Sequence, residues 1–172
     1  MLSLKKLWFK IIRVYYLKFN PKKYLSYIGV KYGNDCRLIS ITSSTFGSEP
    51  YLITLGDKVT ITKNVQFLTH DGSLDLFREQ HPDIEYFGNV SVGNKVFIGY
   101  SSIILPGTTI GDNVIIGAGS VVKGTVRSDS VYAGVPAKRI CSVSEYYDKN
   151  HDSFTSTKHL DPETKRRFLE NR

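Results

Sequence analysis

The chain of 172 residues has few of the features that build metal centres, disulfide frameworks or membrane spans. Its two cysteines, Cys36 and Cys141, lie far apart and form no CxxC pair, so neither a cysteine metal site nor a disulfide framework is expected. No apolar run approaches the roughly 18 residues of a transmembrane helix. The apolar start at Leu7–Phe9 is broken by Lys10 and Arg13, too early for the core of a signal peptide. These absences predict a reduced, cytoplasmic protein of one domain with a short appendage.

Acidic residues are missing from the N-terminal segment, although the chain has 16 of them against 23 Lys and Arg, a formal net charge of +7. Residues 3–19 show helical spacing, with an apolar side and a basic side, and Asn20-Pro21 is expected to end that helix. Two interpretations stay open. The helix caps the open end of the fold that follows, which we prefer, or it lies on an anionic membrane surface. No nucleic-acid partner is expected, because the chain holds no recognised nucleic-acid-binding module.

The most regular feature is a repeat of six residues. Glycine follows the aliphatic residue in four of the six hexads that start at Val92, and the fifth position is usually small or β-branched. We expect the glycine to supply the backbone conformation of a tight turn. Stacked coils of this kind bury a continuous ladder of apolar side chains, so the repeat predicts a solenoid of short parallel strands. The predicted ladder comprises Leu55, Ile61, Phe67, Val92, Ile98, Ile104, Ile110, Ile116 and Val122.

The repeat is interrupted between His70 and Asn89. Residues 71–89 contain charges, aromatics and a proline but no hexads, which predicts a functional loop extruded from a coil. After Pro136 the hexads cease, and helices are expected to begin near Ser142 and at Asp161-Pro162. The predicted organisation is a basic helical segment (1–27), a repeat domain (28–140) and a C-terminal helical extension (141–172).

Six short motifs stand in order on the hexad background: Phe46–Tyr51, Leu68–Gly72, Val96–Gly99, Ile104–Gly107, Ile116–Ser120 and Ala133–Arg139. Together these motifs resemble the hexapeptide-repeat acyltransferases, in particular the branch that acetylates sugars in bacterial polysaccharide and nodulation pathways. The resemblance implies a mainly β fold, a left-handed parallel β-helix, with terminal helical extensions. It also implies a homotrimer with active sites between neighbouring subunits, acetyl-CoA as the donor, a sugar hydroxyl as the acceptor and no required metal.

His70 is the candidate general base. Histidine accepts and returns a proton near neutral pH, and His70 stands where the hexads give way to the loop. The matching histidine of the family is the general base. Asp71 and Glu49 are candidates for orienting the imidazole or binding a sugar hydroxyl, although Asp71 is equally well explained as a turn residue with Gly72.

The acceptor is expected to meet further side chains of the two motifs and the loop. Ser48 and Tyr51 belong to the same motif as Glu49, and Arg78 and Tyr86 are candidates for gripping a phosphate or carboxylate. Phe97 stands where many sugar-acetylating relatives have tryptophan. Phenylalanine keeps an apolar face there but lacks the indole N–H donor, which leaves the choice of acceptor open.

The donor is expected to bind the later coils. The resemblance assigns the thioester and pantetheine end to the backbone at four positions and the CoA phosphates to three basic side chains. The four positions are Gly99, Tyr100, Gly117 and Ala118, and the basic residues are Lys123, Lys138 and Arg139.

Three other functions compete with O-acetylation. N-acetylation of an amino sugar, free or nucleotide-linked, is the first alternative. A hexapeptide-repeat carbonic anhydrase would need three zinc histidines on neighbouring coils, and only His70 lies on the repeat. A non-catalytic scaffold is disfavoured by the intact motifs around His70 and at Ala133–Arg139.

Overall fold

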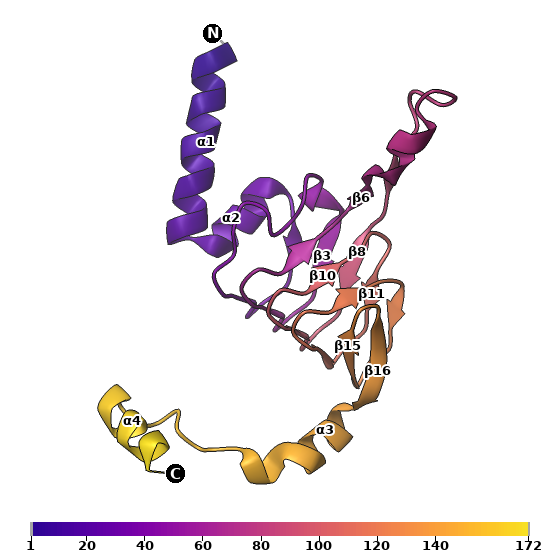
Figure 1. Cartoon of the computed structure of the whole chain (residues 1–172). Helices are drawn as coiled ribbons and strands as arrows, with labels where there is room; N and C mark the ends of the chain where they lie inside the picture. The colour runs from indigo at the N-terminus through magenta and orange to yellow at the C-terminus, as the bar shows by residue number, and fades with distance from the viewer. Residues whose placement is uncertain (1, 172) are drawn as a thin grey trace.

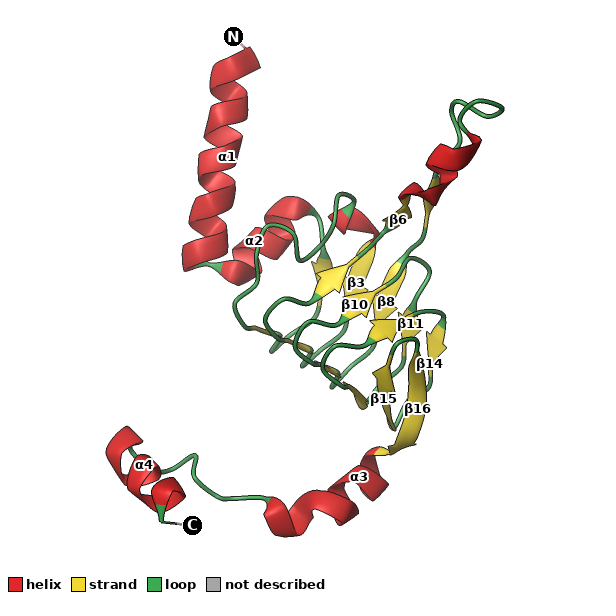
Figure 2. Cartoon of the chain, in the orientation of Figure 1, coloured by secondary structure: helices red, strands yellow, loops and turns green. Residues whose placement is uncertain are grey.

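The computed structural model describes residues 2–171, and for residues 2–7, 9 and 10 it describes the backbone alone. Two helices, α1 (Leu2–Phe19) and α2 (Pro21–Ile28), precede a solenoid of short strands. Two further helices, α3 (Val143–Asn150) and α4 (Pro162–Glu170), follow it, with the short 3-10 turn η3 (His151–Ser153) between them. Figures 1 and 2 show the solenoid as the centre of the molecule, with α1 and the C-terminal segment extending away from it.

The solenoid has three parallel sheets, which form the faces of a β-helix and confirm the predicted mainly β fold. The first sheet contains β1 (Lys31–Tyr32), β3 (Ile53–Leu55), β8 (Val90–Val92), β11 (Thr109–Ile110) and β14 (Thr125–Val126). The second contains β2 (Arg37–Leu38), β4 (Thr60–Ile61), β9 (Phe97–Ile98), β12 (Val114–Ile116), β15 (Ser130–Gly134) and the antiparallel β16 (Ala137–Ser142). The third contains β5 (Gln66–Phe67), β10 (Ile103–Ile104) and β13 (Val121–Val122).

Register between coils follows the hexads. Ile98 pairs with Ile116 and Ile104 pairs with Val122, so a regular coil takes three hexads. Every residue of the predicted apolar ladder is buried, with at most 4% of its surface exposed. Each coil therefore contributes three apolar side chains to one continuous core, which confirms the interpretation of the repeat.

The glycines that follow the ladder residues serve a different purpose from the predicted one. Positive φ angles occur two residues after the glycine position, as at Lys95 (54°), Gly107 (77°) and Asn113 (54°). A Cβ atom on Gly99 would lie 2.6 Å from the amide nitrogen of Ala118 in the next coil. The expectation that these glycines supply turn conformations was therefore wrong: they allow neighbouring coils to stack closely.

A column of carboxylate and amide side chains joins the coils at the corner between the first and the second sheet. Asp57 Oδ1 accepts a hydrogen bond from the backbone N–H of Asn34 at 2.6 Å, and Asn94 Oδ1 accepts one from the backbone N–H of Asp57 at 2.8 Å. Asp112 Oδ1 accepts two, from the backbone and the side-chain amide of Asn94, at 2.5 and 2.9 Å. These contacts satisfy backbone donors at the corners, where no strand supplies an acceptor.

The N-terminal end of the solenoid is covered by α2, a helix that we did not predict. Asn20 was interpreted only as a stop, but its side chain caps the next helix by accepting from the backbone N–H of Lys23 at 3.0 Å, with Pro21 in the first turn. Tyr24 and Leu25 of α2 are fully buried. The helix predicted over residues 3–19 is confirmed as α1. The end of the solenoid is covered mainly by α2, and Tyr16 and Leu17 in the last turns of α1 also pack against the core.

The C-terminal helices begin where the sequence predicts. Ser142 and Glu145 form a reciprocal capping box at the start of α3, and Asp161 caps α4. The hairpin of β15 and β16 was not predicted, because the hexad pattern ends while strand pairing continues in the antiparallel direction. None of the described helices is long and apolar enough to cross a membrane. The division at residues 27/28 and 140/141 stays a prediction.

Candidate active site

The two coils that build the site are longer than the regular ones. Phe67 pairs with Ile104, which is 37 residues away and therefore 19 more than in a regular coil. The extra residues equal the predicted loop 71–89, which projects from the solenoid in Figure 1. At its base β6 (His70–Asp71) pairs antiparallel with β7 (Tyr86–Phe87), and the 3-10 helix η2 (Gly72–Phe77) follows β6. The loop therefore leaves and re-enters the coil without disturbing its register.

His70 is held from one side by Glu49 and Ser48, and Thr69 in turn holds Glu49. Its Nδ1 lies 3.1 Å from Glu49 Oε2 and 3.1 Å from Ser48 Oγ. Thr69, which is fully buried, donates its hydroxyl to the same Glu49 oxygen at 2.9 Å. The His70 side chain is 49% exposed, whereas that of Glu49 is only 18% exposed. The carboxylate is thus shielded while the imidazole faces outward.

The carboxylate determines which imidazole nitrogen carries the proton. Partial burial alone would raise the pKa of Glu49, but hydrogen bonds from Thr69, His70 and Ser48 outweigh it and hold the pKa below its ordinary value of 4.5. An ionised carboxylate only accepts hydrogen bonds, so Nδ1 of His70 carries the proton that it donates to Glu49. In the described chain Nε2 has no hydrogen-bond partner. Its lone pair is therefore free to accept a proton.

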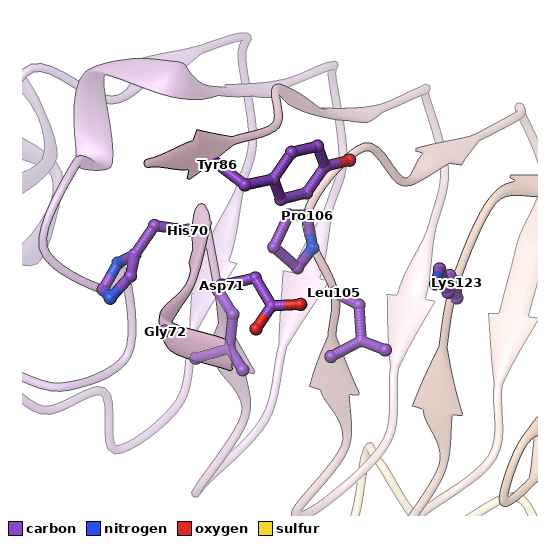
Figure 3. A pocket seen from close by; sticks show the side chains of 8 residues that line it. His70, Asp71, Gly72, Tyr86, Leu105, Pro106 and Lys123 are labelled. Carbon is purple, nitrogen blue, oxygen red and sulfur yellow. The ribbon is translucent and has the colours of Figure 1, made fainter. Parts of the chain in front are cut away.

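A pocket of about 610 Å³ opens beside His70. Figure 3 shows Lys123 on the far side of Leu105 and Pro106 from His70, with Asp71 and Tyr86 between. Three predicted site residues thus meet His70 here, although Lys123 was expected among the donor-binding residues. The complete lining consists of Leu68, His70, Asp71, Gly72, Tyr86, Leu105, Pro106 and Lys123.

Asp71 has a structural role as well as a place in the pocket. Its Oδ1 accepts from the backbone N–H of Ser73 at 2.9 Å and caps η2. Hydrogen bonds from Ser73, followed by the charges of Lys123 and His70, lower the pKa of Asp71. The turn interpretation of Asp71 therefore has direct support, and among the described residues its carboxylate makes no hydrogen bond to the imidazole.

Of the remaining acceptor candidates, Arg78, Tyr51 and Phe97 are not among the residues that line this pocket. Arg78 is tied into the loop, because Nε contacts Asp75 Oδ1 at 2.9 Å and Nη1 donates to the carbonyl of Pro82 at 2.9 Å. It lines a smaller adjoining pocket of about 180 Å³. Tyr51 lies over the C-terminal cap of α2, where a Cβ on Gly29 would come within 3.2 Å of the tyrosine Cβ.

Sequence reasoning missed Phe87, Leu105 and Pro106, and it gave no role to Leu68, which also lines the pocket, or to Thr69, which donates to Glu49. Phe87 pairs with His70 across the β6–β7 ladder, and the two rings lie 6.2 Å apart. Leu105 and Pro106 line the pocket. The last two belong to a recognised motif but had been given no role, while Phe87 could be placed only after the antiparallel pairing was known.

The donor-binding candidates gather on a different corner, at the ends of β9 and β12. Gly99 N and Gly117 N are used between coils, donating to Ile116 and Tyr132 carbonyls at 2.8 Å each. The amides of Tyr100 and Ala118 have no acceptor within the described chain. The structure thus leaves two of the four predicted positions with free backbone donors.

The other predicted residues of this surface are side chains of the second sheet. Phe97 on β9 is exposed, and Lys138 and Arg139 are exposed on β16. Lys123 is separated from them, since it follows β13 of the third sheet and faces the His70 pocket. Among the described residues no group of three or more His, Cys, Asp or Glu side chains could hold a metal ion.

Comparison with known proteins assigns the class. The family model of bacterial hexapeptide transferases (six repeats) matches residues 89–124. The chain is 46% identical to protein CapG of Staphylococcus aureus over 169 residues, 98% of this chain and 96% of CapG. It is 35% identical to galactoside O-acetyltransferase of Escherichia coli over 107 residues, 60% of this chain and 52% of that enzyme.

Solved structures agree with this assignment. A hexapeptide-repeat acetyltransferase of Vibrio cholerae in complex with acetyl-CoA has a TM-score of 0.51 at 26% identity, over 66% of this chain and 60% of that one. A maltose O-acetyltransferase of Clostridium difficile has a TM-score of 0.56 at 25% identity, over 82% and 87%. The chain belongs to the hexapeptide-repeat transferases. It is a left-handed β-helix acetyltransferase of that family, as the resemblance implied.

Proposed function

We propose that this protein transfers an acetyl group from acetyl-CoA to a saccharide hydroxyl during synthesis of a bacterial surface polysaccharide. The observation that carries the proposal is the His70–Glu49 pair, which engages Nδ1 of His70 and leaves Nε2 without a hydrogen-bond partner in the described chain, beside a pocket. Two relatives support a saccharide hydroxyl as the acceptor. One is the galactoside enzyme, and the other is a putative lipopolysaccharide biosynthesis O-acetyl transferase of Escherichia coli, 49% identical over 51 residues, 30% of this chain and 26% of that protein.

In the proposed reaction Nε2 of His70 removes the proton of the acceptor hydroxyl as its oxygen attacks the thioester carbonyl. The C–S bond breaks, and the leaving CoA thiolate takes the proton back from the imidazolium. Glu49 stabilises the positive charge of that imidazolium and keeps the ring in one orientation. Thr69 and Ser48 hold the Glu49 carboxylate in turn.

We propose that a homotrimer completes the site. Within one protomer the free amides of Tyr100 and Ala118 lie on a corner of the second sheet, whereas His70 and Lys123 lie beside the third. In a trimer the corner of one subunit that holds Tyr100 and Ala118 would face the His70 pocket of its neighbour. One acetyl-CoA would then contact both that corner and that pocket. The proposed location is the cytoplasm, at the inner face of the membrane, through residues 3–19.

Release of free CoA in the presence of nucleotide-sugars and glycans tests the activity. Amino sugars belong in the panel, because a preference for them would replace O-acetylation by N-acetylation. His70→Ala should lower kcat/KM by about 10²–10⁴-fold, the usual contribution of a general base. His159→Ala, an exposed histidine beyond the solenoid, should retain the full rate. An unchanged rate in His70→Ala would defeat the mechanism.

A further inference from the structure

We infer that the outer face of α1 docks on an anionic lipid surface. This inference deepens the proposed location at the membrane and concerns a surface separate from the catalytic pocket. The end of the solenoid is covered by α2 and by Tyr16 and Leu17 in the last turns of α1, so the opposite side of α1 takes no part in the cap. Figure 1 shows α1 projecting away from the coils, with only its last turns next to α2.

The two sides of α1 differ in their contacts. On the inner side, Arg13 donates to Tyr24 Oη at 3.3 Å and to the carbonyl of Ser43 at 3.1 Å, while Tyr16 and Leu17 pack against the core. These contacts fix how the helix is rotated about its axis. The side of α1 opposite to Arg13, Tyr16 and Leu17 therefore faces away from the solenoid.

That outer side carries a stripe of large apolar residues at helical spacing: Trp8, Ile11, Tyr15 and Phe19. Each of the four is more than half exposed, from 54% at Ile11 to 65% at Phe19. The rings of Tyr15 and Phe19 lie 5.2 Å apart, which makes the lower half of the stripe one continuous apolar surface. An aromatic stripe on a basic helix is typical of helices that lie in a membrane interface.

Charge determines which partner fits. The chain has no acidic residue before Asp35, whereas eight basic residues lie between positions 5 and 31. Lys18 Nζ lies 5.4 Å from the ring centre of Phe19, so a cation borders the apolar stripe directly. The matching stripe of a second copy would bring the same positive charge against it, while anionic headgroups attract each lysine. An anionic bilayer therefore fits this face better than another α1 does.

The single tryptophan of the chain makes the surface directly observable, because Trp8 belongs to the stripe. Full-length protein is mixed with vesicles of phosphatidylcholine, with or without phosphatidylglycerol. We expect a blue shift of Trp8 fluorescence and co-sedimentation with the anionic vesicles only, both weakened by added salt. Absence of binding to the anionic vesicles would overturn the inference.

Paired variants locate the binding face. Tyr15→Glu combined with Phe19→Glu retains Trp8 as the reporter and should weaken vesicle binding by about tenfold or more, since it removes buried apolar area and adds repulsion. Phe168→Glu on α4, where the phenylalanine is 48% exposed, is the matched control and should bind like the wild type. Equal vesicle binding by the double variant and the wild type would contradict the inference. If that double variant also had a smaller mass in light scattering, the stripe would be assigned to contact between copies instead.

The readouts also separate this inference from the proposed function. CoA release with a water-soluble acceptor should be the same for the wild type and the double variant. Vesicle binding without any CoA release would defeat the proposed function and leave the docking face standing. CoA release without vesicle binding would defeat the docking face and leave the proposed acetyl transfer standing.

Discussion

The regular coils and the two longer coils around His70 use the same scaffold in different ways. In the regular coils each ladder residue has a counterpart one coil away, and stacking alone determines its surroundings. The coil that starts at Tyr32 reaches its partner Leu55 after 23 residues, five more than a regular coil, and the extra length holds Ser48 and Glu49. The loop 71–89 lengthens the next coil. Catalytic candidates thus gather where two insertions meet, and repetition provides the stability that these insertions do not.

The largest loss of stability should come from a substitution at a corner of the regular coils. Gly99→Ala places a Cβ within 2.6–2.8 Å of three backbone atoms of the next coil, which can be relieved only by separating the coils. We expect a loss of about 4 kcal/mol or more in the free energy of unfolding, measured by chemical denaturation. Gly72→Ala, whose Cβ meets open space, is the control. Equal stability of both variants would break the comparison.

The ladder should respond almost as strongly. Ile110→Ala removes a buried side chain, 2% exposed, from the middle of the core, and should cost about 3 kcal/mol of unfolding free energy. Because Ile110 does not line the pocket, kcat/KM per folded molecule should not change. A variant as stable as the wild type would show that the ladder does not carry the fold.

At the two longer coils, a substitution should lower activity far more than stability. Glu49→Gln keeps the shape of the side chain but allows the amide to present a donor to Nδ1, which destroys the preference for the productive tautomer. We expect kcat/KM to fall by about 10²-fold or more, while the free energy of unfolding falls by only about 1 kcal/mol. Glu79→Gln in the exposed part of the loop should behave like the wild type. A rate for Glu49→Gln equal to that of this control would remove Glu49 from the mechanism.

The smallest effect concerns pH. The folded protein holds the pKa of Glu49 below 4.5. The stability that its ionised form contributes is therefore present above the unfolded pKa and is lost as the pH falls through the lowered folded value. We expect wild type to exceed Glu49→Gln by about 1 kcal/mol at neutral pH, a difference that shrinks only below pH 4.5. Denaturant titrations of both proteins across this range would reveal it. A difference that grows in acid would contradict the cause given for the lowered pKa.

The hexad pattern predicted the fold better than it predicted the site. Hexads indicate which side chains form the core, because an aliphatic residue at every sixth position matches neither the helical period nor the alternation of a single strand, and every ladder residue is indeed buried. The helix α2 was not predicted, because the same residues, Asn20 and Pro21, end one helix and begin the next. His70 was recognisable from its motif and its position at the interruption. Its role as the base stays a prediction that geometry supports.

By itself the sequence determined the repeat, the buried ladder, the position of the inserted loop and the starts of the C-terminal helices, all of which depend on neighbours along the chain. Tertiary structure alone decided that Glu49 rather than Asp71 contacts the imidazole, that Phe87 lies opposite His70, and that Lys123 faces the pocket. The physical reason is the stacking of coils. It brings Glu49 into hydrogen-bond contact with Thr69 and His70, which are 20 and 21 positions away, and no local pattern encodes such contacts.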